Sequence, residues 1–288
     1  MKKKQSAWTM TTARRIGAAL VLLVCACARP IETPPRPIEN SLFAAAPAQQ
    51  WRMPPRLREI SGLATSPDGH LFGHDDEIAI IYLLDAERGE LRKAFALGDP
   101  IERGDFEGLA ITPSGEFYLT TSRGLLYRFR EAGDGAHADF ERFDTGLGET
   151  CEIEGLAYLA AEDSLILACK ANEARAMRDV VSLHAWSPAT GQTEAWLNVP
   201  VSTIAEAAGL PGFHPSAIEL HSDRILLLAG REQAFAELSY GGDVLSARAL
   251  GARHPQPEGL ALSPDGALFI ADEGAGGRAL LSRYDRRQ

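Results

Sequence analysis

The sequence predicts an all-β protein, a five-bladed β-propeller with four-stranded blades. One phrase, best preserved as E-G-L-A followed by a turn and a second apolar strand, recurs through the chain. Its copies are EISGLATSPDGHLFGHDDE, DFEGLAITPSGEFYLTTSR, EIEGLAYLAAEDSLILACK, HPSAIELHSDRILLLAGRE and QPEGLALSPDGALFIADEG. Equivalent positions are Ser61, Glu107, Glu154, Ser216 and Glu258, spaced by 46, 47, 62 and 42 residues. A four-stranded blade has about this length, so each phrase marks one blade.

Each phrase predicts a β-hairpin, and two further strands complete the blade. Pro67-Asp68-Gly69, Pro113-Ser114-Gly115 and Pro264-Asp265-Gly266 supply turn residues, because proline fixes φ and glycine tolerates the tight return. Alternating apolar runs follow, for example at 79–85 and 91–97 and again at 234–240 and 244–250. The long third interval contains 202–213, which predicts a short helix and a loop.

The two ends of the repeat region predict how the ring closes. The last copy ends with 278–288, one strand short of a blade, and 49–53 offers a spare strand before the first copy. Pairing these ends would remove two exposed sheet edges. Six blades, with a degenerate blade in the long interval, is the alternative count, and a β-sandwich with similar hairpins is the alternative fold. Five copies of one phrase favour the five-bladed propeller.

The N-terminus predicts export and lipidation. Lysines and arginines precede a short apolar run that ends in Val24-Cys25-Ala26-Cys27, which is similar to a bacterial lipobox with Cys27 as the lipid acceptor. A plain secretory leader is the alternative. We therefore expect a signal peptide over 1–27, a proline-rich tether over 28–49 and the propeller over 50–288. Because residue 29 is arginine, where aspartate often signals inner-membrane retention, we expect the outer membrane, on the periplasmic side of the cell envelope.

The charge of the chain limits its partners. Removing residues 1–26 takes away five lysines and arginines and moves the formal net charge from −10 to −15. Such a surface repels nucleic acid and attracts cations or basic partners. We expect no nucleic acid, a membrane contact through the lipid anchor only, an unknown protein or small-molecule ligand, and a monomeric domain.

From Leu57 to the C-terminus, the five phrases and the acidic residues after two of them resemble the SdiA-regulated family of bacterial envelope proteins. That family is similar to the NHL-repeat and phytase-like propellers. The resemblance implies a five-bladed propeller with bound calcium and leaves the biological role undefined. This chain departs from the pattern in two phrases, which carry Ser61 and Ser216 where the others carry glutamate.

The phrase geometry predicts an acidic opening at one end of the central channel. The start of each inner strand and the end of the next strand lie at the same end of a propeller. Glu107, Glu154 and Glu258 should therefore converge, joined by Asp75 and Asp272. Calcium accepts carboxylates from separate loops, so these five are the expected metal ligands. The alternative is ordinary ion pairing of the glutamates with Arg123, Lys170 and Arg231.

The cysteines of the third phrase predict a disulfide. If Gly155 pairs near Ile166, Cys151 and Cys169 lie nearly opposite each other on neighbouring strands, and export places them in an oxidising compartment. Two buried free thiols are the alternative. A nucleophilic role is disfavoured because the phrase contains no histidine.

Two function classes remain open. The first is a lipid-anchored, calcium-binding propeller that holds a ligand or partner at its acidic opening. The second is a calcium-dependent esterase or phosphoesterase, similar to the phytase-like and lactonase-like propellers, with His74 or His214 as acid or base. The sequence has no G-x-S-x-G, phosphate loop or H-E-x-x-H motif, so other hydrolase and nucleotide chemistries lack support.

Overall fold

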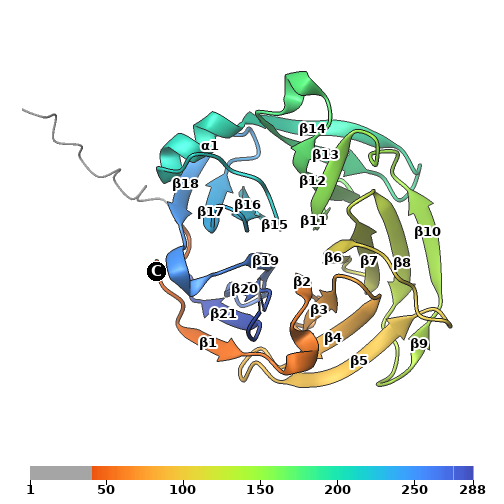
Figure 1. Cartoon of the computed structure of the whole chain (residues 1–288). Helices are drawn as coiled ribbons and strands as arrows, with labels where there is room; N and C mark the ends of the chain where they lie inside the picture. The colour runs from red at the N-terminus through yellow and green to blue at the C-terminus, as the bar shows by residue number, and fades with distance from the viewer. Residues whose placement is uncertain (1–40, 275, 288) are drawn as a thin grey trace, which may run out of the picture. The chain divides into compact units, whose positions relative to one another are not determined.

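A computed structural model describes residues 41–274 and 276–287 as a ring of five β-sheets around a common axis (Figure 1). We call the region along this axis the channel. Cys27, the leader and most of the expected tether lie outside the described residues. The count of five blades is confirmed. The long third interval adds no blade: it carries helix α1 (Val201–Ala208), as its sequence predicts.

Each blade is a four-stranded antiparallel sheet whose first strand faces the channel. The strands of blade I are β2 (Ile60–Thr65), β3 (Leu71–Asp75), β4 (Ile80–Leu84) and β5 (Leu91–Leu97), with the short β9 (His137–Ala138) added parallel to β5. Blade II contains β6 (Phe106–Ile111), β7 (Glu116–Thr121), β8 (Leu125–Arg130) and β10 (Phe140–Asp144). Blade III contains β11 (Cys151–Leu159), β12 (Ser164–Asn172), β13 (Val180–Trp186) and β14 (Thr193–Pro200).

Blades IV and V complete the ring. Blade IV contains β15 (Ala217–His221), β16 (Arg224–Ala229), β17 (Ala234–Leu238) and β18 (Val244–Ala249). Blade V contains β19 (Pro257–Leu262), β20 (Leu268–Asp272), β21 (Leu280–Tyr284) and, as its outer strand, the N-terminal β1 (Gln49–Arg52). Short 3-10 helices are η1 (Pro55–Leu57), η2 (Arg175–Met177) and η3 (Gly251–Arg253).

The two chain ends pair to close the ring, as the sequence predicts. Strand β1 lies antiparallel to β21, with Gln49 opposite Arg283 and Arg52 opposite Leu280. The chain already contacts the propeller before this strand. Phe43 is buried, and the backbone N–H of Leu42 donates a hydrogen bond to the buried Glu237 of β17 at 3.0 Å. Residues of blades IV and V are therefore joined by the segment that precedes β1.

The hydrophobic core is divided among the five interfaces between neighbouring blades. Near the channel these interfaces are so narrow that four of the five inner strands carry glycine at the equivalent position, and the fourth blade carries Ala217. A Cβ on Gly108 would lie 2.7 Å from the backbone nitrogen of Leu156, and one on Gly155 would lie 2.8 Å from that of Ile218. The glycine of the repeated phrase thus lets one inner strand approach the next.

Candidate functional site

A β-bulge at the start of the inner strands sets the side-chain direction of the acidic residues. In β6 the pairing with β7 passes from Phe106 to Gly108 and skips Glu107. The same register shift skips Glu154 in β11 and Glu258 in β19. A bulged residue leaves the regular alternation and is turned in a new direction. The residue before the glycine of the phrase is therefore the one that does not pair with the neighbouring strand.

The three glutamates form an acidic ring, a name used here for Glu107, Glu154 and Glu258. The charge of Glu154 acts on both Glu107 and Glu258, so the three carboxylates from blades II, III and V share one region. Hydroxyl side chains occupy the equivalent positions in the other two blades: Ser61 lies 3.5 Å from a Glu107 oxygen, and Ser216 lies beside Glu258. The carboxyl groups of Glu107 and Glu258 therefore lie close enough to Glu154 for its charge to act on them.

Lys170 of β12 is the cation that enters the acidic ring. Its Nζ donates a hydrogen bond to Glu154 Oε1 at 2.7 Å and lies 3.5 Å from Glu152. Burial alone would lower the pKa of Lys170, but the Glu154 hydrogen bond and the surrounding carboxylates raise it overall. Lys170 therefore stays protonated and balances one of the three ring charges.

The acidic ring resists ionisation of its carboxyl groups. Burial, with the Glu154 charge added, raises the pKa of Glu258 to about 8. Burial and the charges of Glu154 and Asp105 also raise the pKa of Glu107. For Glu154, burial raises the pKa while the Lys170 hydrogen bond lowers it, and the net shift is upward. An added cation would relieve this repulsion.

The other two basic side chains that could neutralise the ring bind elsewhere. Arg123 pairs with the exposed Glu149 at 3.0 Å, and Arg231 lies 3.9 Å from Glu232. Simple ion pairing therefore accounts for one glutamate of the ring, Glu154, through Lys170.

Three other residues singled out in the sequence are enclosed in the blades. Asp75 is 8% exposed, and its Oδ1 accepts hydrogen bonds from the backbone N–H groups of Glu77 and Ile78, both at 3.1 Å. Asp272 is fully buried and lies 2.7 Å from His254 Nδ1, in a network that continues to Tyr284. His74 is also fully buried, and desolvation lowers its pKa to about 4, so it is neutral.

His214 lies at a small cavity beside the acidic ring. Its Nδ1 is 2.7 Å from Glu232 Oε1, and its backbone N–H donates to Glu232 Oε2 at 3.0 Å. The cavity, of about 290 Å³, is lined by His214, Lys170, Glu258 and neighbouring residues of blades IV and V. Glycine at position 230 leaves room for Glu258, since a Cβ there would lie 2.7 Å from Glu258 Oε1. The sequence indicates His214 as a candidate acid or base, but its pairing with Glu232, which orients it, is seen only in the structure.

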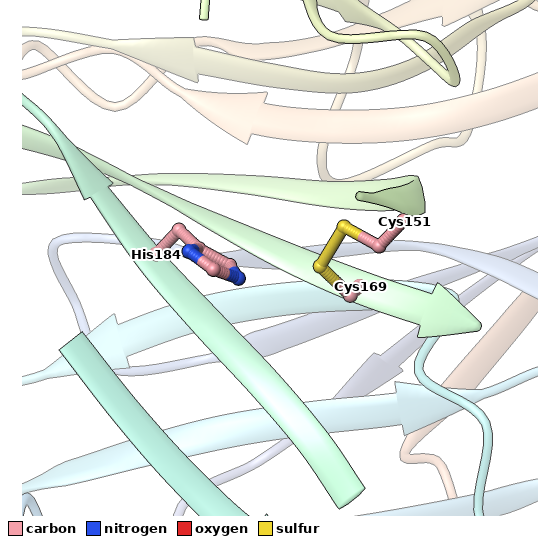
Figure 2. Close-up of side chains that lie close together, drawn as sticks. All are labelled: Cys151, Cys169 and His184. Carbon is pink, nitrogen blue, oxygen red and sulfur yellow. A yellow bond between two sulfur atoms is a disulfide. The ribbon is translucent and has the colours of Figure 1, made fainter. Parts of the chain in front are cut away.

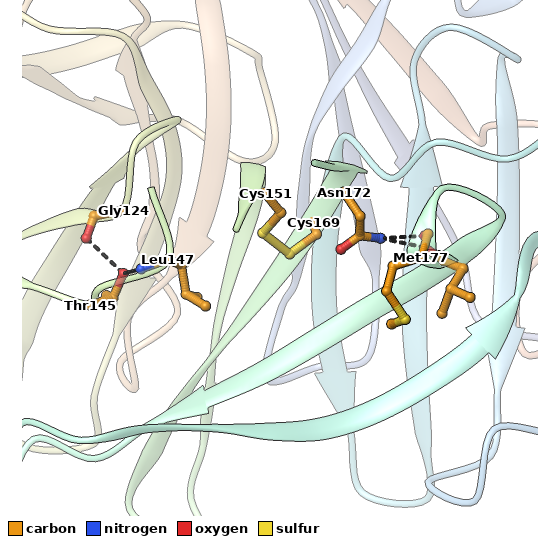
Figure 3. Close-up of a disulfide and its surroundings, with 8 residues drawn as sticks. Gly124, Thr145, Leu147, Cys151, Cys169, Asn172 and Met177 are labelled. Atoms are coloured by element: carbon orange, nitrogen blue, oxygen red, sulfur yellow. Dashed lines mark hydrogen bonds between the residues drawn. A yellow bond between two sulfur atoms is a disulfide. The ribbon is translucent and has the colours of Figure 1, made fainter. Parts of the chain in front are cut away.

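The predicted disulfide between Cys151 and Cys169 is confirmed, with a Cα–Cα distance of 5.7 Å. Its register differs from the expected one. Gly155 pairs with Ala168 rather than near Ile166, and two bulges in β11 place Ile153 opposite Cys169 and Cys151 opposite Asn172. The bridge is therefore diagonal. Figure 3 shows Asn172 beyond it, where its side chain donates hydrogen bonds to the carbonyls of Met177 and Val180.

His184 of β13 lies next to this disulfide (Figure 2). Within the described residues, Cys151, Cys169 and His184 are the one set of three histidine, cysteine or acidic side chains whose ligand atoms all lie within 4.8 Å of one another. Both sulfurs are bonded to each other, so this set is a packed disulfide rather than a metal site.

The disulfide indicates an oxidising, extracytoplasmic compartment. No helix in the described ranges is both long and apolar enough to cross a bilayer.

Comparison with known proteins places the chain among β-propellers. No protein-family profile matches it, and no curated protein matches it in sequence. Among solved structures, glutaminyl cyclase of Myxococcus xanthus is 16% identical, with a TM-score of 0.56, over 84% of this chain and 97% of that one. The PQQ-bound aldose sugar dehydrogenase of Streptomyces coelicolor is 14% identical, with a TM-score of 0.51, over 84% of this chain and all of that one. At these identities the likeness concerns the fold alone.

Proposed function

We propose that this chain is a lipid-anchored propeller of the bacterial cell envelope, of the SdiA-regulated type. In this proposal it binds calcium and, with it, a ligand or partner at the acidic ring. The observation that carries the proposal is the convergence of three glutamates from three blades around a single lysine. When all three glutamates are ionised, one lysine leaves two carboxylates without a counter-ion, and a divalent cation that displaces their protons supplies that charge.

The chemistry of the donors suits calcium. Calcium takes six to eight oxygen ligands in loose geometry. The acidic ring offers carboxylate oxygens from Glu107, Glu154 and Glu258. Hydroxyl oxygens are added by Ser61 and Ser216. Glycine at position 230 lets the Glu258 carboxylate lie against the backbone there, since a Cβ would be 2.7 Å from Oε1. In the described residues no three carboxylates lie within 4.8 Å of one another. Binding therefore requires the ring side chains to close inwards, with water completing the shell.

The calcium proposal is tested by thermal unfolding of the intact protein with calcium and with chelator. At about 100 times its dissociation constant, a ligand specific for the folded state adds about 2.7 kcal/mol. We expect calcium to raise the melting temperature of the wild type and of Glu149→Gln, whose carboxylate lies outside the ring. We expect the increase to be lost in Glu258→Gln. A melting temperature indifferent to calcium in the wild type would remove the metal from the proposal.

The lipid anchor is tested separately at the cysteines of the leader. Cys27→Ser should release the protein from the membrane fraction, because the thiol that accepts lipid is removed. Cys25→Ser is the matched control and should leave the protein in the membrane fraction. Release by both variants, or by neither, contradicts lipidation at Cys27.

A second candidate function, calcium-dependent ester or phosphoester hydrolysis, is favoured by the His214–Glu232 pair. A carboxylate that orients a histidine at the edge of a cavity is a common arrangement for general acid or base catalysis. Lys170 lines the same cavity and would attract an anionic substrate. Bound calcium would polarise the ester oxygen.

Turnover of generic phosphate and carboxylic esters by the calcium-loaded protein distinguishes the two functions. Hydrolysis that is lost in His214→Asn, with the calcium-dependent melting temperature retained, supports the enzyme. Calcium binding with no turnover supports the ligand-binding function.

A further inference from the structure

A second cavity lies at the other end of the channel, and we call it the hairpin pocket. The inner strands run from the acidic ring towards the hairpin turns, and this cavity is lined where they end, by Ala64, Ala110, Ala157, Glu219 and Leu262 together with turn residues such as Pro113. Its volume is about 480 Å³. Cavities of about 300–1,000 Å³ are typical of small-molecule sites.

The walls of the hairpin pocket combine apolar and polar side chains, and the repeated phrase explains why it is hollow. The residue two places after the conserved glycine position is alanine in four of the five phrases. Three of these, Ala64, Ala110 and Ala157, line the pocket. Small side chains at the same level of three blades leave the central space open, while Leu109, Leu156 and Leu220 give it an apolar lining.

The fourth phrase places Glu219 where the others have alanine. The carboxylate is fixed in position by two backbone donors: the N–H of Leu220 donates to Oε1 at 2.8 Å, and that of Leu262 donates to Oε2 at 3.3 Å. No cationic side chain among residues 41–274 and 276–287 lies within 4.0 Å of it. Burial raises the pKa of Glu219 to about 7, against the effect of these two hydrogen bonds.

The other charged groups around the pocket do not neutralise Glu219. His221 binds Asp223, and Asp265 at the rim binds Ser263. Arg286 is exposed at the rim. The pocket therefore presents one oriented acidic group, Glu219, beside the alanines and leucines of the inner strands, with Arg286 and Asp265 at the rim.

We propose that the hairpin pocket binds a small organic monoamine, with the protonated amino group on Glu219 and the apolar body against the three alanines. A charge-assisted hydrogen bond in a partly desolvated site is stronger than one between neutral groups. The apolar walls favour a hydrocarbon chain. Arg286 at the rim disfavours a second positive charge on the same ligand.

The test is calorimetric titration of the intact protein with hexylamine, hexan-1-ol and hexanoate. These probes share an apolar body and differ in the head group. We expect hexylamine to bind at least about tenfold more tightly than the alcohol, and hexanoate to bind most weakly. Equal affinities for amine and alcohol would overturn the proposal.

Two variants test whether the amine binds at Glu219 in the hairpin pocket. Glu219→Ala restores the residue of the other four phrases, so the fold should be retained, and Glu219→Gln keeps the shape of the side chain. Both should lose the preference for amine over alcohol. Glu258→Gln is the control at the acidic ring and should keep it. Amine binding that survives both Glu219 variants but fails in Glu258→Gln assigns the amine to the acidic ring and contradicts the proposal.

Discussion

The two ends of the central channel are built by the same five strands, yet they have opposite character. At one end, three carboxylates and a lysine crowd together, and burial raises the pKa of each carboxylate. At the other end, alanines and leucines surround a single carboxylate, Glu219. The inner strands differ between their ends in one structural respect: the acidic end carries β-bulges, and the hairpin end keeps a regular ladder.

This difference shows how a repeat gives one channel two kinds of site. A bulged residue is outside the alternation of the strand, so it can bear a charge without placing that charge in the interface between blades. Residues of the regular ladder pack against neighbouring blades and are small or apolar for that reason. Glu219 breaks this rule within the ladder, which is why we regard it as a binding residue.

The largest effect is expected from Gly108→Val, which should disturb both ends of the channel at once. The new side chain would collide with the backbone of Leu156, and no rotamer avoids a clash that begins at Cβ. We expect a loss of more than about 3 kcal/mol of unfolding free energy, measured by denaturant titration. Position 217 is naturally alanine in blade IV, so Ala217→Gly should cost only about 1 kcal/mol. Equal losses in the two variants would contradict the close approach of blades II and III.

Removing the disulfide should affect the acidic end more than the hairpin end, because Cys151 lies three residues before Glu154. Closing a chain of 18 residues contributes about 3 kcal/mol in the loop-entropy treatment. We expect the Cys151→Ala, Cys169→Ala double variant to lose about that amount and to bind calcium more weakly. Its affinity for hexylamine should be unchanged. A matching loss at both ends would show that blade III transmits strain along the whole channel.

Replacing Lys170 should increase the difference in charge between the acidic end and the hairpin end of the channel. Lys170→Gln leaves Glu154, which is 5% exposed, without its cation, and we expect a loss of about 2 kcal/mol in chelator that calcium partly restores. Arg123→Gln is the matched control: its partner Glu149 is almost fully exposed, so the change should stay within about 0.5 kcal/mol. Thermal unfolding with and without calcium measures both.

The smallest effect is a fall in stability with rising pH. Glu258 has a pKa raised to about 8, so between its ordinary pKa and that value the folded protein keeps a proton that the unfolded chain has lost. Its contribution to stability is therefore present below the ordinary pKa, falls as pH rises between that value and about 8, with a slope of at most about 1.4 kcal/mol per pH unit, and is lost above about pH 8. Melting curves in chelator between about pH 5 and pH 8 should show the fall, and Glu258→Gln should reduce it. A melting temperature that rises over this range contradicts the assignment.

The sequence by itself determined the architecture. Five copies of one phrase, with turn residues at fixed places and a spare strand at the N-terminal end, specified five blades, the ring closure and helix α1, because repeats and turn chemistry are local properties of the chain. Two cysteines at hairpin spacing also sufficed for the disulfide. The grouping of Glu107, Glu154 and Glu258 followed from the same repeat.

Only the tertiary structure decided which partners the acidic and histidine side chains have. Asp75 and Asp272 follow the phrase as closely as the ring glutamates do, yet Asp75 accepts hydrogen bonds from the Glu77 and Ile78 backbone and Asp272 pairs with His254, and the repeated phrase specifies neither contact. The bulges in β11 changed the register around Cys169, since one skipped residue moves every later pair. Glu219 was visible in the sequence as the departure from alanine, but its meaning required the cavity that five strand ends enclose together.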